Sequence, residues 1–268
     1  MNWPKEITAG GKRLECRRLG PQPGEAPTVV LLHEGLGAMA LWRDFPERLA
    51  AATGWGVFVY SRAGYGQSEA ADLPRPLDYM TREATEVLPE VLETIGFERG
   101  VLMGHSDGAT IAAEYAGSVE DFRVRGLILE APHFFTETMG LAEIARAREV
   151  FATGDFKAKM AKYHDDPEAT FRGWNDAWLD PKFKSWHVGE VIDYWRVPCL
   201  AIQGAQDQYG TLAQIREIEE RSYAPVETLV LDDCRHAPHA DQAEAVLAAC
   251  AEFLARLERI EAAEPDAA

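Results

Sequence analysis

The residues best suited to chemistry in this sequence are Ser106 and the run around it, Gly104-His105-Ser106-Asp107-Gly108. A serine hydroxyl becomes a useful nucleophile when a turn exposes it and a neighbouring base takes its proton. Glycines two residues before and after Ser106 permit a turn tight enough to lift its hydroxyl above a sheet. The apolar run 101–103 predicts a buried strand before the turn, and 109–115 predicts a helix after it. This context predicts a nucleophilic serine, although the motif alone also fits a purely structural turn.

A serine nucleophile needs a base and an acid, and two other turns carry them. The apolar runs 197–203 and 226–232 predict strands, and Asp207 and His236 each follow one of them. Because functional loops of a parallel sheet lie beyond the carboxyl ends of its strands, we expect Ser106, Asp207 and His236 to meet at one rim. His236 would then take the proton of Ser106, and Asp207 would orient the imidazole and stabilise its charged form.

These assignments have competing interpretations. Glu130 ends another predicted strand and is the alternative acid, but no obvious loop follows it, so Asp207 is favoured. His236 could be a surface histidine at the start of the last helix, but its position after the last buried strand favours catalysis. His33 and His105 are expected to support their turns. No His, Asp and Glu residues have the spacing of a metal site, and we expect neither a metal nor a cofactor.

Composition limits the class of protein. The 268 residues, 47% of them hydrophobic, suffice for one large core with an insertion. The formal net charge of −17 argues against nucleic acid or an anionic membrane as partner and leaves a small-molecule substrate. No apolar run approaches the roughly 20 residues that span a bilayer, and the N-terminus has no secretory pattern, so we expect a cytoplasmic protein. Cys199 and Cys250 lie in apolar runs and are expected to be buried thiols. A homo-oligomer is compatible with the sequence.

Strands alternate with helices along most of the chain, which predicts a mostly parallel sheet with helices on both faces. The strands are predicted over 14–19 (an edge strand), 28–33, 55–61, 101–103, 125–131, 197–203 and 226–232. The helices outside the insertion are predicted over 41–53, over 84–95 with a kink or a restart at Pro89, after Ser106, and near the C-terminus, where 261–268 should fray. The segment 132–195 has no strand pattern and many aromatic residues, so we expect a helical cap insertion there. Residues 1–131 and 196–268 would form the core domain.

With these features in place, the chain resembles the α/β-hydrolase superfamily, particularly its capped esterase, lactonase and C–C hydrolase branch. The resemblance covers Thr28 to about Leu257, and its markers are His33-Glu34-Gly35, Gly104-His105-Ser106-Asp107-Gly108, Gly204-Ala205-Gln206-Asp207 and Arg235-His236-Ala237-Pro238. It implies the α/β-hydrolase fold with a helical cap. It also implies that Ser106 is the nucleophile, His236 the general base and Asp207 the acid, and that the backbone N–H groups of Gly35 and Asp107 form the oxyanion hole.

Three positions depart from the family pattern. Glu34 stands where the family usually has glycine, Arg235 stands where glycine commonly precedes the catalytic histidine, and the acid loop continues as Gln208-Tyr209-Gly210. None of these departures removes a catalytic group. They affect the identity of the substrate that we expect. Glu34 is expected either to contact the substrate or the attacking water, or to be a solvated turn residue. Trp178 either belongs to the core of the cap or lines the pocket.

The expected function is hydrolysis of a small apolar or aromatic carboxylic ester, lactone or thioester by a serine hydrolase, through an acyl-enzyme. Within the same class, the alternative is cleavage of a carbon–carbon bond next to a carbonyl, as in a vinylogous diketone. An alternative of another class is a ligand-binding protein that has this fold but catalyses no reaction. The complete set of catalytic residues argues against that alternative. The sequence does not specify the acyl group or the leaving group.

Overall fold

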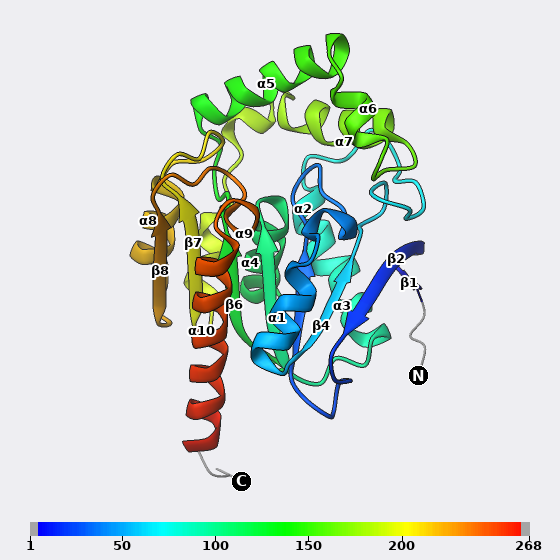
Figure 1. Ribbon diagram of the computed structural model, residues 1–268. Helices are drawn as coiled ribbons and strands as arrows, with labels where there is room; N and C mark the ends of the chain where they lie inside the picture. The colour runs from blue at the N-terminus through cyan, green and yellow to red at the C-terminus, as the bar shows by residue number, and fades with distance from the viewer. Residues whose placement is uncertain (1–4, 264–268) are drawn as a thin grey trace.

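In the computed structural model, which describes residues 5–263, an eight-stranded sheet lies between two layers of helices (Figure 1). The strand order is β1-β2-β4-β3-β5-β6-β7-β8, in which β3 to β8 run parallel to one another and β2 is antiparallel to both of its neighbours, β1 and β4. The strands are β1 (Glu6–Ala9), β2 (Lys12–Leu19), β3 (Thr28–Leu32), β4 (Gly56–Tyr60), β5 (Gly100–His105), β6 (Val124–Glu130), β7 (Cys199–Gly204) and β8 (Val226–Leu231). The predicted fold class, a mostly parallel sheet with helices on both faces, is confirmed.

Alternate residues of the central strands face different helix layers, as the two-residue repeat of a strand requires. Val29 and Leu31 of β3 pack in the cluster that contains residues of α1 (Phe45–Thr53) and α10 (Ala243–Ala263). Val30 and Leu32 pack in the opposite cluster, with residues of α3 (Leu88–Thr94) and α4 (Asp107–Ser118). Because both faces are covered, every residue of β3, β4, β5 and β7 is buried, which explains why these strands read as continuous apolar runs.

The N-terminal edge of the sheet differs from the prediction. The strand predicted over 14–19 is β2, but it is not an edge strand, because it pairs with both β1 and β4. The true edge is β1, whose four residues alternate between exposed and buried. So short a strand carries too few residues for a periodic signal.

The remaining core helices fit the sequence with local changes. The helix predicted over 41–53 is divided into a short 3-10 turn, η1 (Met39–Trp42), and α1. The helix predicted over 84–95 begins earlier, as α2 (Tyr79–Arg82) and the π-helical turn η2 (Glu83–Val87), and restarts as α3 with Pro89 in its first turn. The others are α8 (Ala213–Arg221) and α9 (Pro238–Asp241). The predicted fraying of 261–268 falls mainly outside the described residues.

The segment between β6 and β7 forms a layer of helices over the carboxyl ends of the parallel strands (Figure 1). It contains α5 (Thr138–Thr153), α6 (Phe156–Met160), α7 (Pro167–Trp178), η3 (Phe183–Ser185) and η4 (Gly189–Tyr194). Its only β pairing is an isolated bridge between Phe135 and His187. The division of the chain into a core domain and a cap at 132–195 remains a prediction.

Cys199 and Cys250 are fully buried free thiols, which confirms the prediction for them. Within residues 5–263, no helix is long and apolar enough to cross a membrane.

Candidate active site

Ser106 occupies the sharp turn between β5 and α4. Its backbone angles, φ 54° and ψ −118°, are strained for a residue with a side chain, and its N–H donates to the Glu130 carbonyl at 2.8 Å. A Cβ at Gly108 would lie 2.1 Å from the Leu32 carbonyl oxygen, and one at Gly104 would lie 2.2 Å from the Gly108 carbonyl oxygen. These backbone contacts are why both flanking positions require glycine.

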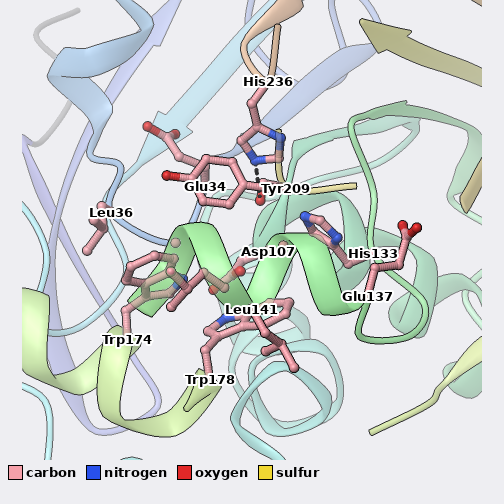
Figure 2. Close-up of a pocket in the computed structure, with 14 residues that line it drawn as sticks. Glu34, Leu36, Asp107, His133, Glu137, Leu141, Trp174, Trp178, Tyr209 and His236 are labelled. Atoms are coloured by element: carbon pink, nitrogen blue, oxygen red, sulfur yellow. Dashed lines mark hydrogen bonds between the residues drawn. The ribbon is translucent and has the colours of Figure 1, made fainter. Parts of the chain in front are cut away.

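The structure brings Ser106, His236 and Asp207 into one hydrogen-bonded chain, drawn in part in Figure 2. Ser106 Oγ lies 2.9 Å from His236 Nε2, and His236 Nδ1 lies 2.8 Å from Asp207 Oδ2. Because a carboxylate only accepts, Nδ1 carries the hydrogen, and Nε2 is free to accept the serine proton. This is the tautomer that a general base requires.

Asp207 is held as a carboxylate by the groups around it. Its Oδ2 also accepts from Gln203 Nε2 at 2.7 Å, and its Oδ1 accepts from the Tyr209 N–H at 2.8 Å. Burial favours the protonated acid, but the charge of His236 and the hydrogen bonds from His236 and Tyr209 outweigh burial and lower the pKa of Asp207. The acid therefore stays ionised and stabilises an imidazolium at His236.

Glu130, the alternative acid, does not reach His236. Its Oε2 accepts from His239 Nδ1 at 2.7 Å, and both side chains are buried. His239 in turn packs on the ring of Trp42, with 4.4 Å between ring centroids. The Glu130–His239 pair is thus separate from the Ser106–His236 pair and anchors the start of α9.

Gly35 and Asp107, whose backbone N–H groups are expected to bind an oxyanion, line the same pocket as Ser106. Asp107 is the first residue of α4, so its N–H has no partner within the helix. Gly35 lies in the turn after β3. A Cβ at Gly35 would lie 2.2 Å from Trp174 Nε1, so only glycine fits against that ring.

Glu34 is not a solvated turn residue, because its carboxylate pairs with a buried histidine. Its Oε2 lies 3.5 Å from Nδ1 of the buried His105, whose Nε2 donates to the His236 carbonyl at 2.6 Å. Burial disfavours an imidazolium, but the Glu34 carboxylate outweighs it and raises the pKa of His105 to about 9. The same partner holds the pKa of Glu34 well below its usual range. The charge of Glu34 beside the oxyanion site is therefore balanced by a cation.

A buried arginine that the sequence analysis missed secures the Gly35 turn. Arg62, 1% exposed, donates from its guanidinium to the carbonyls of His33 and Glu34, and its N–H donates to His33 Nε2 at 3.0 Å. Burial, with the charge of Arg62, keeps the pKa of His33 well below its usual range, so His33 is neutral. The only sequence signal for this role was the position of Arg62, directly after a buried strand.

The pocket above Ser106 is mainly apolar and has a cavity of about 90 Å³. It is lined by Glu34, Gly35, Leu36, Ser106, Asp107, His133, Glu137, Gly140, Leu141, Ile144, Trp174, Trp178, Tyr209 and His236. Trp178 lines it and also donates from Nε1 to the Tyr79 hydroxyl at 3.0 Å, so it serves both packing and the pocket wall. His133, Trp174 and Tyr209 were not foreseen, because their place depends on how the helical layer packs on the core. Within residues 5–263, no cluster of three or more His, Cys, Asp or Glu side chains could hold a metal ion.

Comparison with known proteins places this geometry in context. Residues 29–249 match the model of the alpha/beta hydrolase family. A proline iminopeptidase from Lactobacillus delbrueckii subsp. lactis is 25% identical over 163 residues, which cover 57% of this chain and 55% of that protein. The match thus spans little more than half the length of that relative.

Solved structures share the fold at low sequence identity. The enol-lactonase of Burkholderia xenovorans LB400 aligns over 93% of this chain and 99% of its own, with a TM-score of 0.72 and 21% identity. The 2-hydroxy-6-oxo-6-phenylhexa-2,4-dienoate hydrolase of Rhodococcus sp. strain RHA1 aligns over 95% of this chain and 98% of its own, with a TM-score of 0.77 and 17% identity. At these identities the likeness establishes the fold.

Proposed function

Because this chain belongs to the alpha/beta hydrolase family, we propose that it is a serine hydrolase that cleaves a small apolar or aromatic carboxylic ester, lactone or thioester. The observation that carries the proposal is the hydrogen-bonded chain from Ser106 through His236 to Asp207 at the floor of an apolar pocket. Two backbone donors in the same pocket complete the set of groups that acyl transfer needs.

In the proposed reaction, Ser106 Oγ attacks the carbonyl carbon while His236 Nε2 takes the hydroxyl proton. The N–H groups of Gly35 and Asp107 stabilise the oxyanion of the tetrahedral intermediate, each contributing on the order of 3 kcal/mol. Collapse of the intermediate breaks the bond to the leaving group, which departs with the proton from His236. Water then attacks the acyl-enzyme, His236 takes one of its protons, and Ser106 regains that proton as the acid is released.

The helical segment 132–195 serves in this proposal as a cap. Leu141 and Ile144 on α5 and Trp174 and Trp178 on α7 supply apolar walls of the pocket. By excluding water, these walls strengthen the interaction between the oxyanion and its donors. They also favour an apolar or aromatic acyl or leaving group of small size.

The carbon–carbon hydrolase alternative is supported by the likeness to the dienoate hydrolase, which acts on a carboxylate. The lining of the pocket favours an uncharged substrate instead, since it contains acidic residues, among them Glu137, and neither lysine nor arginine. A carboxylate substrate would meet no cation at the pocket surface.

The test is hydrolysis of p-nitrophenyl acetate by the wild type, by Ser106→Ala and by Ser222→Ala, a control serine outside the pocket. We expect a burst of p-nitrophenol and steady turnover in the wild type and the control, and at least a thousandfold loss in Ser106→Ala. A fluorophosphonate probe should label Ser106 in the native protein and not after heat denaturation. More than a few per cent of residual activity in a folded Ser106→Ala would refute Ser106 as nucleophile. Binding of esters without turnover by the wild type would instead favour the ligand-binding alternative.

A further inference from the structure

His133 is a buried histidine in the pocket that the proposed reaction does not use. It follows β6, and its backbone is fixed to Thr110 of α4: Thr110 Oγ1 donates to the His133 carbonyl at 2.7 Å. Its ring contacts the rings of two pocket residues, with 5.4 Å between its centroid and that of Trp178 and 5.6 Å to that of His236. The side chain therefore has one defined position beside the proposed general base.

The ring of His133 is polar, buried and without a protein partner. The residue is 5% exposed and lines the pocket, and within residues 5–263 no group hydrogen-bonds either ring nitrogen. Burial and the nearby charge of His236 lower the pKa of His133 to about 3, so the ring is uncharged at neutral pH. A neutral imidazole offers one N–H donor and one acceptor. Because His133 lines the pocket, a bound ligand can pair with this donor and this acceptor.

The position of His133 indicates which part of a substrate it would meet. His236 must deliver its proton to the leaving group, so the leaving group departs beside His236 and therefore close to His133. In Figure 2, His133 and Glu137 lie on the opposite side of the pocket from Glu34, Leu36 and Trp174. Since Glu34 precedes the oxyanion donor Gly35, the His133 side is the end of the pocket remote from that donor.

The surroundings of His133 select against negative charge. The Glu137 carboxylate on the same side is already engaged, accepting from the Thr211 hydroxyl at 2.7 Å and from Gln214 Nε2 at 2.8 Å. These bonds hold the carboxylate at this end of the pocket. A leaving group that carried its own carboxylate would be repelled there, whereas a hydroxyl would find a free donor and acceptor on His133.

From this geometry, and on the premise that the protein is the serine hydrolase proposed above, we infer that His133 is a specificity-determining residue. Its ring forms a hydrogen bond with an uncharged hydroxyl group on the leaving group. The preferred substrates are then esters whose alcohol or phenol carries a second hydroxyl, rather than esters of purely apolar or anionic alcohols.

The experiment compares three acetates that differ only in the leaving group: phenyl acetate, 3-hydroxyphenyl acetate and 3-acetoxybenzoate. For the wild type we expect kcat/KM to be at least tenfold higher for the hydroxyl-bearing ester than for phenyl acetate, and lowest for the benzoate. In His133→Phe, which keeps an aromatic ring against Trp178, the ratio of the first two should fall to about one, whatever the absolute rate. His187→Phe, at an exposed histidine outside the pocket, should keep the wild-type ratio.

Further measurements keep failure of this inference distinct from failure of the proposed function. Absence of hydrolysis of all three acetates, with no labelling of Ser106, would refute the serine hydrolase itself. Hydrolysis without a hydroxyl preference, or with a preference that survives in His133→Phe, would overturn the role of His133 alone. Phenyl 3-hydroxybutyrate and phenyl butyrate differ by a hydroxyl on the acyl group and share one leaving group. If the wild type prefers the first of them as strongly, and His133→Phe loses that preference, His133 does not bind the leaving group. If phenylalanine impairs folding in thermal melts, His133→Leu provides the same comparison.

Discussion

The Glu34 carboxylate and the His105 imidazole form an ion pair, with 3.5 Å between Oε2 and Nδ1, and Glu34 directly precedes the proposed oxyanion donor Gly35. The other ring nitrogen of His105 donates to the His236 carbonyl. Burial disfavours a charge on His105, but the Glu34 carboxylate outweighs burial and raises the pKa of His105 to about 9, so His105 is an imidazolium at neutral pH. One buried cation therefore connects the turn that holds Gly35 to the loop that holds His236.

This pair predicts a stability that depends on pH above neutrality. The pKa of His105 is about 9 in the folded protein, above the value of about 6.5 for an unfolded histidine. Its contribution is therefore complete below about pH 6.5 and lost as the pH rises through about 9. The difference in unfolding free energy between the wild type and His105→Gln should shrink by on the order of 3 kcal/mol from pH 6 to pH 9.5, measured by urea denaturation.

The variant Glu34→Gln supplies the control for this prediction. Without the carboxylate, His105 loses the largest interaction that raises its pKa, so the wild type should lose stability relative to Glu34→Gln over the same pH interval. Adding His105→Gln to Glu34→Gln should cost less than His105→Gln costs alone at pH 6, since the pair is already broken. A difference between wild type and His105→Gln that stays constant from pH 6 to pH 9.5 would contradict a charged His105.

Asp207 and Glu130, the acids paired with His236 and His239, should respond differently to neutralisation. Asp207→Asn presents an amide to His236 Nδ1 and favours the wrong tautomer, so we expect a loss in kcat on the order of ten-thousand-fold. Glu130→Gln weakens only the pair with His239 and should lower the unfolding free energy by about 1–3 kcal/mol, with kcat/KM within about tenfold of the wild type. Steady-state ester hydrolysis and urea denaturation distinguish them. A greater kinetic loss in a folded Glu130→Gln would reverse the assignment of the acid.

The sequence was most informative where one local pattern determines the structure. The apolar runs of β3, β4, β5 and β7 are buried at every residue, as their composition predicted. The run at 226–232, predicted as a buried strand too, forms β8, a partly exposed strand at the edge of the sheet. The glycines around Ser106 are required by backbone contacts shorter than any side chain permits. Since the carboxyl ends of parallel strands lie at one edge of a sheet, the positions of Asp207 and His236 after two predicted strands were enough to predict that they meet there.

The rest of the site depends on contacts between elements far apart in the chain. Glu34 was recognised as unusual, but its partner His105 became apparent only when β3 and β5 lay side by side. Neither Tyr79 nor Asp107 carries a sequence signal for their mutual hydrogen bond. His133 follows the strand that ends at Glu130, where the sequence offered no loop pattern, and its role depends on Trp178 packing above it.

The hydroxyl of Tyr79 connects the helical layer to the start of α4. It donates to Asp107 Oδ2 and accepts from Trp178 Nε1, and all three side chains are buried. Asp107 Oδ1 has no hydrogen-bond partner within residues 5–263, so Tyr79 supplies the one hydrogen bond that its buried carboxylate has there. The same residue provides, through its backbone N–H, one of the proposed oxyanion donors.

Tyr79→Phe should therefore impair both stability and catalysis. It leaves the Asp107 carboxylate and the Trp178 N–H buried without partners, and each such group costs about 1–3 kcal/mol, so we expect at least about 2 kcal/mol less unfolding free energy in urea. Tyr223→Phe, whose side chain is 87% exposed, should stay within about 0.5 kcal/mol of the wild type. Since Asp107 and Trp178 both border the pocket, kcat/KM for phenyl acetate should fall in Tyr79→Phe and not in Tyr223→Phe. Equal stability of the two variants would mean that this hydrogen-bonded bridge does not hold the helical layer on the core.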